Sequence, residues 1–457
     1  MIASLRHSLL AALIFSAGWP LPSSAQNPAP GPAPNQSLSA PSDTQAEALL
    51  VRRDTALRSG PAASSSELAR LPPQTPLTRT SDRLGGWMQV KTPSGSSGWV
   101  SVFDVSALFP GVADTSPRAQ QSNFAVDALR GVTSLFRGRR QTLIATSTLG
   151  IRRLGGEFPF ATPNLAAVAQ ADAQRLSPAQ AEQFAAEALL RPAAVPALPG
   201  AAVTAPAADL AALLAQAAPL IDEPTEIDIG RQYAAVLLAS KPLHPDMALQ
   251  RYVNQLGRWL SLHSGRPQLP WVFGVLNDEG FNALAAPGGY VFITQGLLAS
   301  VGSEAELAGL LAQQIAHVSA KHHLKALAQA ARADAAARAN AAADKPGQRP
   351  PDAAPLAALS RQVLLAGLPP ADELQADRQS VVLAARAGFD PYGLVAVLLN
   401  LRDVAEGDPL FTHTVATHPP AQARLDALDQ AMGNRLDGFT GQTPVPIAQR
   451  LTQNRPK

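Results

Sequence analysis

Short alternating segments separated by turns occupy residues 46–109, whereas long helical patterns occupy most of residues 223–434. In the first region, residues 86–90 alternate as a strand, Ser94 and Gly95 are typical of a hairpin turn, and 98–100 form a return strand. Strands this short and this closely spaced predict a small β-barrel. The second region predicts a mainly helical α+β domain with a small sheet. The chain is therefore expected to contain more than one domain.

Charge and cysteine content exclude several classes of protein. Lys and Arg number 37 against 35 Asp and Glu, so the formal net charge is +2. A nearly neutral chain without long Lys/Arg runs provides no field to hold nucleic acid, so nucleic-acid binding is not expected. The absence of cysteine from the 457 residues rules out disulfides, thiolate zinc sites and a catalytic cysteine.

The N-terminal residues have the organisation of an export signal. Arg6 and His7 precede the apolar run 9–15, and the small residues Ser23 and Ala25 fit a cleavage site before residue 26. A membrane anchor is the alternative, but the run is well below the ~20 residues that span a bilayer. We expect a signal peptide at 1–25, a disordered tether at 26–45, and a periplasmic or secreted protein.

Residues 46–109 contain the landmarks of a known small domain. These landmarks are the corner at 57–61 (LRSGP) and the strands at 85–90 (GGWMQV) and 98–100 (GWV). They resemble the bacterial SH3-type domain, and the resemblance implies binding of cell-wall peptidoglycan peptides or of partner proteins. Trp87 and Trp99 are expected in the barrel core, since a small domain depends on aromatic burial. A ligand groove lined by these two residues is the alternative.

The remaining regions differ in how much they indicate. Residues 110–222 form a helical and linker region with a capped helix start at Ser177, a candidate strand at 141–153 and no assignable chemistry. Residues 435–457 are expected to form a tail. The elements predicted in 223–434 are a helix after Asp246, strands at 271–276 and 290–294, a capped helix after Ser303 and a helix over 373–387.

Four motifs occur in one order within residues 223–434. They are NALAAPGGYVFITQGLL at 282–298, SEAELA at 303–308 running into QQIAHV at 313–318, ELQADR at 373–378 with RAGFDP at 386–391, and THPP at 417–420 with Arg424 and Leu425 beyond. Together they resemble the zinc metallopeptidase family of bacterial envelope proteases and chaperones that includes HtpX, BepA and the CAAX prenyl protease. The resemblance implies a zincin-like fold.

The family pattern assigns a role to each matching residue. In His-Glu-x-x-His, two histidines four residues apart hold one metal ion, and the Glu deprotonates the metal-bound water. The resemblance makes His317 the second histidine, Glu373 the third metal ligand and Asp377 a carboxylate that orients a histidine. His418 matches the Thr-His-Pro histidine, which lies near the metal.

This chain departs from the pattern at the two positions that matter most. Gln313 replaces the first histidine, and Gln314 replaces the catalytic Glu. A glutamine amide cannot take a proton from water, and loss of a general base typically costs ~10²–10⁴-fold in rate. The sequence thus predicts an inactive centre. His317, Glu373 and His418 could still hold zinc weakly; alternatively, the glutamines hydrogen-bond these groups and no metal binds.

His322 and His323 are not expected to join this centre. They follow His317 by five and six residues, so on a regular helix neither shares its metal-facing position. With Lys321 and Lys325 they are predicted to form a solvated basic face.

A binding cleft could outlast the chemistry. In the family, the strand that includes Val291, Phe292, Ile293 and Thr294 is an edge strand that pairs with extended peptide, and such pairing needs no metal. The alternative is that the strand serves only as scaffold. We therefore expect an inactive, chaperone-like binder of peptides or unfolded envelope proteins. The alternatives are an active periplasmic zinc metalloendopeptidase and a cell-wall protein acting through its SH3-type domain.

Overall fold

The computed structural model describes residues 48–107 except 82, residues 162–199, 221–344, 356–402 and 411–439, and the single residues 441 and 449. The expected signal peptide at 1–25, the tether at 26–45 and the candidate strand at 141–153 lie outside the described residues. Within the described ranges, no helix is both long enough and apolar enough to cross a membrane.

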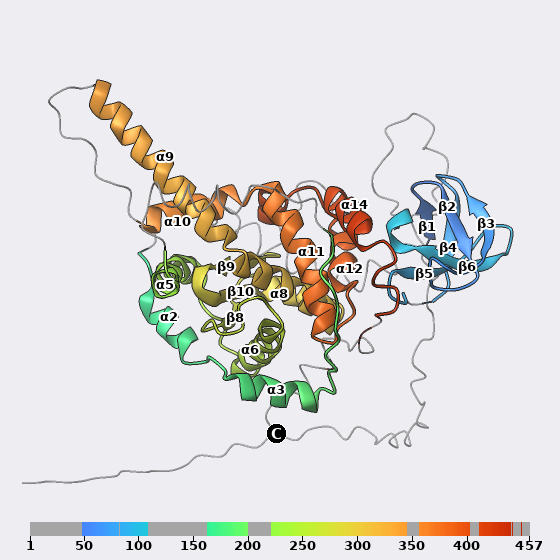
Figure 1. Ribbon diagram of the computed structural model, residues 1–457, viewed down its shortest axis with the longest axis horizontal. Helices are drawn as coiled ribbons and strands as arrows, with labels where there is room; N and C mark the ends of the chain where they lie inside the picture. The colour runs from blue at the N-terminus through green and yellow to red at the C-terminus, as the bar shows by residue number, and fades with distance from the viewer. Residues whose placement is uncertain are drawn as a thin grey trace, which may run out of the picture. The chain divides into compact units, whose positions relative to one another are not determined.

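The SH3-like region consists of seven short strands in one antiparallel sheet, drawn in blue in Figure 1. The strands are β1 (Ala48–Val51), β2 (Thr55–Arg58), β3 (Glu67–Leu71), β4 (Pro76–Arg79), β5 (Trp87–Lys91), β6 (Ser97–Ser101) and β7 (Val105–Ala107), with the 3₁₀ turn η1 (Val102–Asp104) before β7. Their order is β3-β2-β6-β5-β4-β1-β7. The small β-barrel is thereby confirmed. Trp87 is buried as predicted, whereas Trp99 is half-buried.

The rest of the described chain is mainly helical, as predicted. Its helices are α2 (Leu165–Asp172), α3 (Pro178–Glu187), α5 (Glu223–Ser240), α6 (Met247–Leu262), α7 (Gln295–Ser300), α8 (Glu304–Ser319), α9 (His322–Asp344), α10 (Leu356–Ala366), α11 (Pro370–Arg386), α12 (Gly393–Arg402), α13 (Thr412–Thr417) and α14 (Ala421–Met432). Ser177, Asp246 and Ser303 cap α3, α6 and α8 through their side chains. Leu436 is buried in the same core, so packing continues beyond residue 434.

A three-stranded sheet lies among these helices. It consists of β8 (Val272–Leu276), β9 (Ala283–Ala286) and β10 (Tyr290–Thr294), in the order β8-β10-β9. β10 pairs in parallel with β8 and antiparallel with β9, and all five of its residues are buried. The expectation that the strand containing Val291–Thr294 is an edge is therefore wrong, because neighbouring strands use the backbone groups on both of its sides. β8 and β9 are the two outer strands.

Helix α8 runs through the interior and ends abruptly. Fourteen of its residues are buried, and it packs closely against α11. Ala320 follows the last helical residue, and Lys321 has a left-handed backbone with φ of 58°. A new helix, α9, starts at His322 and extends away from the other helices in Figure 1. The break turns the chain, so helical spacing cannot be counted across it.

Candidate functional site

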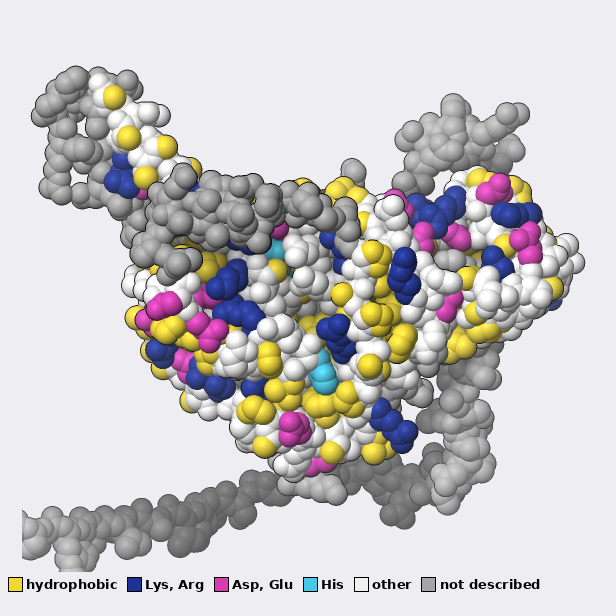
Figure 2. Space-filling model, in the orientation of Figure 1, with side chains coloured by type: hydrophobic (Ala, Val, Ile, Leu, Met, Phe, Trp, Pro, Cys, Tyr) yellow, Lys and Arg dark blue, Asp and Glu magenta, His cyan; other side chains and the backbone are white. Residues whose placement is uncertain are grey.

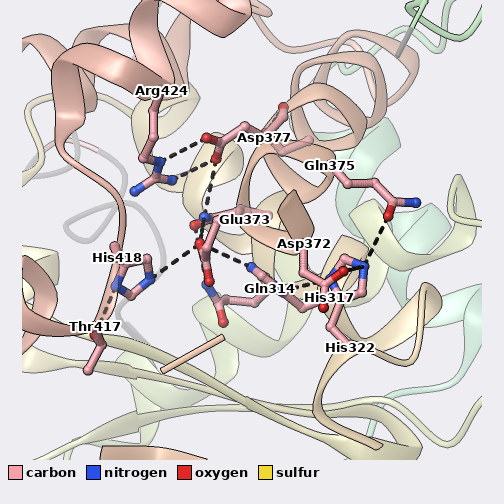
Figure 3. A network of polar contacts seen from close by, with 12 residues as sticks. Gln314, His317, His322, Asp372, Glu373, Gln375, Asp377, Thr417, His418 and Arg424 are labelled. Atoms are coloured by element: carbon pink, nitrogen blue, oxygen red, sulfur yellow. Dashed lines mark hydrogen bonds and ion pairs between the residues drawn. The ribbon is translucent and has the colours of Figure 1, made fainter. Parts of the chain in front are cut away.

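Helices α8 and α11 bring the predicted residues together. Glu373 and Asp377 lie four residues apart on one face of α11, and Gln313 and His317 lie four apart on the facing side of α8. Figure 3 shows the side chains of Glu373 and Asp377 near His317, with His418 approaching from the segment after α13. Glu373 and Asp377 are only 2% and 1% exposed, so every charge here needs a partner.

The two glutamines are used by the centre itself. Gln313 Nε2 donates to Glu373 Oε2 at 3.3 Å and to Asp377 Oδ1 at 3.2 Å. Gln314 Nε2 donates to Gln313 Oε1 at 3.3 Å. Both partners of the Gln313 amide are carboxylates, which accept only, so its nitrogen must face them. These are the hydrogen bonds anticipated for a centre in which glutamine replaces a metal ligand.

Glu373 is the electrostatic centre of the site. His317 Nε2 and His418 Nε2 each lie 3.6 Å from Glu373 Oε2. Burial alone raises the pKa of Glu373, but His317, His418 and then Arg424 lower it more and hold it at about 2. Glu373 is therefore a carboxylate at neutral pH, facing two imidazole nitrogens.

Asp377 is neutralised by Arg424, a residue for which no role was predicted. Arg424, on α14, donates through Nε and Nη2 to the two Asp377 carboxylate oxygens at 2.8 and 2.6 Å. Both side chains are buried. This two-pronged pair is the geometry that arginine provides and lysine does not. Arg424 already follows the Thr-His-Pro motif in sequence, but its partner becomes evident only when α11 and α14 pack together.

The hydrogen-bond partners fix the protons on His317 and His418. His418 Nδ1 lies 3.1 Å from the Thr414 carbonyl oxygen, which only accepts, so the proton sits on Nδ1. His317 Nδ1 lies 3.1 Å from His322 Nδ1, and His322 Nε2 faces Gln375 Oε1 at 3.3 Å. Assigned from these partners, His317 donates from Nδ1. Both histidines present Nε2 to Glu373 Oε2, so a ring protonated at Nε2 donates to that carboxylate.

The prediction of a solvated basic face at His322 and His323 is wrong. His322 is fully buried, and the two rings lie 5.1 and 5.7 Å from the His317 ring. Burial, reinforced by the charge of His317, lowers the pKa of both to about 3, so they are neutral at pH 7. The cause is the break at Lys321, which no glycine or proline marks in the sequence.

The donor set fits a zinc ion only in part. His317, Glu373 and His418 converge, as the weak-site hypothesis required, but Gln313 adds an N–H donor directed at the same Glu373 oxygen that would bind the ion. Among the described residues, no group of three or more His, Cys, Asp or Glu side chains has the geometry of a metal site. An amide N–H is not a metal ligand, so we derive no chemical step through a metal here.

Comparison with known proteins gives two family matches. Residues 247–432 match the model of peptidase family M48, and residues 53–106 match that of the bacterial SH3 domain. The first match includes all the site residues of α8 and α11. The second covers most of the seven-stranded sheet.

Individual relatives are similar over part of the chain. The beta-barrel assembly-enhancing protease of Escherichia coli (strain K12) is 30% identical over 213 residues, which are 45% of this chain and 44% of that protein. The corresponding protein of Yersinia pestis is 29% identical over 212 residues, again 45% and 44%. The mitochondrial metalloendopeptidase OMA1 of Schizosaccharomyces pombe is 30% identical over 185 residues, or 39% and 52%.

The matches thus extend over about half the length of each relative. Fold, motif order and family models agree for the two separate regions of the chain. This chain carries a peptidase family M48 domain, preceded by a bacterial SH3 domain.

Proposed function

We propose that the M48 domain of this chain no longer hydrolyses peptide bonds and instead binds extended or unfolded polypeptide in the cell envelope. The observation that carries the proposal is the hydrogen bonding of the two glutamines. Gln314 stands where the general base is required, and its amide donates to Gln313. Gln313 stands where the first histidine is required, and its amide donates to Glu373 and Asp377. Neither can activate water.

The neighbouring carboxylates do not replace the missing base. Asp377 is held by two hydrogen bonds from Arg424 and one from Gln313. Glu373, with a pKa of about 2, is too weak a base to take a proton from water at neutral pH. Any zinc at this centre would rest on His317, Glu373 and His418 without a base beside it, which supports binding in place of hydrolysis.

Polypeptide binding is supported by the position of β9. It is one of two outer strands and has one side free of strand pairing among the described residues, whereas the backbone of β8 also bonds the Gln250 and Asn254 side chains. An extended peptide adds to a sheet at such a free side. This moves the predicted peptide contact from Val291–Thr294 to the neighbouring strand. The envelope location rests on the signal-like N-terminus and on relatives named for assembly of β-barrels.

Restoring the family residues tests this proposal. We expect the unaltered chain to leave unfolded casein intact and to retain well below one zinc per chain after dialysis against a mild chelator. The double variant Gln313→His with Gln314→Glu should gain roughly one zinc per chain and casein hydrolysis. Gln183→His, on the exposed face of α3, is the matched control. Chelator-sensitive hydrolysis by the unaltered chain would contradict the proposal.

Cell-wall binding by the SH3 domain is a second candidate function. Trp99 on β6 is half-buried, and its register partners are Gln89 on β5 and Arg58 on β2. An aromatic ring beside hydrogen-bonding side chains suits a peptidoglycan peptide. We expect the full chain to co-sediment with purified peptidoglycan and Trp99→Ala to reduce this, while Gln313→His leaves it unchanged. Equal sedimentation of all three proteins would count against this function.

A further inference from the structure

A basic pocket lies next to the M48 centre, on another face of the same helices. It has a volume of about 660 Å³ and is lined by the end of α8, the start of α9, one face of α11, the end of α6 and residues 197–198. A volume in this range suits a ligand of a few hundred daltons. On α11, Glu373 and Asp377 face the glutamines, whereas Gln375, Arg378 and Arg386 line the pocket. The pocket is therefore separate from the family site.

The charge of the pocket is one-sided. Lys325, Arg378 and Arg386 line it together with His263, and no Asp or Glu does so among the described residues. Within that part of the chain, Lys325 and Arg378 form no ion pair, and Arg386 uses its Nε on the Val195 carbonyl oxygen at 2.8 Å. Asp372, which is outside the lining, has a pKa that burial raises and that Lys325 partly lowers. In Figure 2, Lys and Arg side chains and one histidine lie near the middle of the helical region with hydrophobic side chains around them.

Two polar atoms at the pocket lack partners. His263 Nε2 and Ser319 Oγ are both buried and form no hydrogen bond with any described residue. Buried polar groups are almost always hydrogen-bonded, so an unpartnered pair in a pocket wall points to a ligand or to water. Burial, and then the charge of Arg386, lowers the pKa of His263. A bound anion would accept hydrogen bonds here and offset that charge.

The spacing of the cations indicates the shape of the ligand. Arg378 and Arg386 are eight residues apart on α11, a rise of about 12 Å. Cations carried this far apart along the helix favour a ligand with two separated anionic groups over one compact anion. Between them, Val382 and Leu383 line the pocket, with Leu198 also in its wall. This arrangement favours a ligand in which an apolar group separates two anionic groups. In an extended peptide, side chains four residues apart lie on one face and span about 13 Å.

We propose that this pocket binds an extended acidic peptide, with two carboxylates about four residues apart on Arg378 and Arg386 and an apolar side chain between them on Val382 and Leu383. Lys325, beside the Gln375 end of α11, adds charge at the Arg378 end. His263 and Ser319 provide hydrogen bonds. Binding of an acidic peptide in this pocket is independent of the glutamine-substituted centre, and it does not require that centre to bind a substrate.

Fluorescence anisotropy on the full chain tests the proposal. The probe is a labelled, C-terminally amidated peptide Glu-Ala-Leu-Ala-Glu, and its match is Gln-Ala-Leu-Ala-Gln. We expect the acidic peptide to bind at least about tenfold more tightly at low salt, with the difference shrinking as ionic strength rises. Arg378→Gln should weaken its binding about tenfold, and Arg378→Lys less. Arg251→Gln, on the exposed face of α6 outside the pocket, is the matched control.

The outcomes separate the proposal from its alternatives. Equal affinity for the two peptides would overturn it, and so would equal weakening by Arg378→Gln and Arg251→Gln. Competition by millimolar inorganic phosphate without any preference for glutamate over glutamine would assign the pocket to a small anion, which also overturns it. Lys325→Gln is a second test of the same charge if Arg378→Gln does not fold, as judged by its thermal unfolding. Casein hydrolysis has no bearing on any of these results.

Discussion

Two buried glutamates in the helical region are neutralised in opposite ways. Glu226, on α5, receives hydrogen bonds from Arg266 to both carboxylate oxygens, at 2.7 and 3.1 Å, and from Lys321 at 3.0 Å. The amide of Gly288 adds a fourth contact at 3.3 Å. Glu373 has no lysine or arginine at hydrogen-bond distance among the described residues; its partners are His317, His418 and the Gln313 amide.

This difference indicates that the Glu226 cluster is structural, whereas the Glu373 cluster can bind a ligand. Permanent cations neutralise Glu226 at every pH at which the fold exists, so its cluster is complete without a ligand. The histidines beside Glu373 carry charge only when protonated, and both present Nε2 to the carboxylate. Such a cluster is completed by reversible binding of a proton, a water molecule or a cation.

Loss of Arg424 should have the largest effect on stability. Arg424 is the cation that pairs with buried Asp377, so Arg424→Gln leaves that carboxylate with one amide contact. Breaking a buried ion pair from one side typically costs about 3–5 kcal/mol in the free energy of unfolding. Urea denaturation at pH 7 measures it. Arg175→Gln removes a surface pair with Asp172 and should cost less than about 1 kcal/mol; a similar loss in both variants would contradict this account.

Loss of Arg266 should cost less, because Glu226 has a second cation. In Arg266→Gln, Lys321 still donates to Glu226 at 3.0 Å, and the shorter side chain leaves room for water. We expect a loss of about 2 kcal/mol in the same urea experiment, below that of Arg424→Gln. A larger loss of stability in Arg266→Gln than in Arg424→Gln would contradict this. It would show that Glu226, rather than Asp377, depends on a single cation.

The response to acid should distinguish Glu226 from its neutral isostere. Burial raises the pKa of Glu226, but hydrogen bonds from Arg266 and Lys321 outweigh it and leave the pKa below its usual 4.5. The folded state therefore binds the proton less well than the unfolded state. Stability from this group is present above about pH 4.5 and is lost as the pH falls below that value.

Glu226→Gln removes this titration. The variant should lose about 1 kcal/mol at pH 7, because Arg266 keeps Glu223 and the amide oxygen still accepts from Gly288. Its stability should then fall less steeply than that of the unaltered chain between pH 4.5 and pH 3. Thermal unfolding across this range tests the difference, and parallel curves would show that Glu226 is not the group that titrates.

The sequence predicted those features that depend on neighbouring residues in the chain. Helix starts at Ser177, Asp246 and Ser303 are local, because a side chain and the backbone three residues on form the cap, and all three were found. The resemblance to the zinc metallopeptidase family placed His317, Glu373 and Asp377 in one centre, and the packing of α8 against α11 brings them together. Long-range pairing was not predictable in this way: Arg424 meets Asp377 only after two helices pack.

The two wrong predictions, an edge strand at Val291–Thr294 and a solvated face at His322 and His323, also concern long-range packing. The strand containing Val291–Thr294 is central because β9 folds back beside it, and strand order is not written in one strand's residues. His322 and His323 were placed on a solvated face by counting along a helix that in fact ends at Ser319. Lys321 adopts φ of 58°, although no glycine at this position predicts a left-handed backbone. The contact of Lys321 with Glu226 and the burial of His322 stabilise that conformation, and both depend on tertiary packing.

Lys321 links the two glutamate clusters, and its replacement should have the smallest effect of those considered. Its side chain is 40% exposed, so loss of the contact to Glu226 in Lys321→Gln should cost about 0.5–1 kcal/mol. Lys321→Gly loses the same contact but suits the left-handed backbone, which is unfavourable for lysine by roughly 1 kcal/mol. The glycine variant should therefore unfold at a urea concentration equal to or above that of the glutamine variant. The reverse order would show that relief of the left-handed backbone at this position does not stabilise the fold.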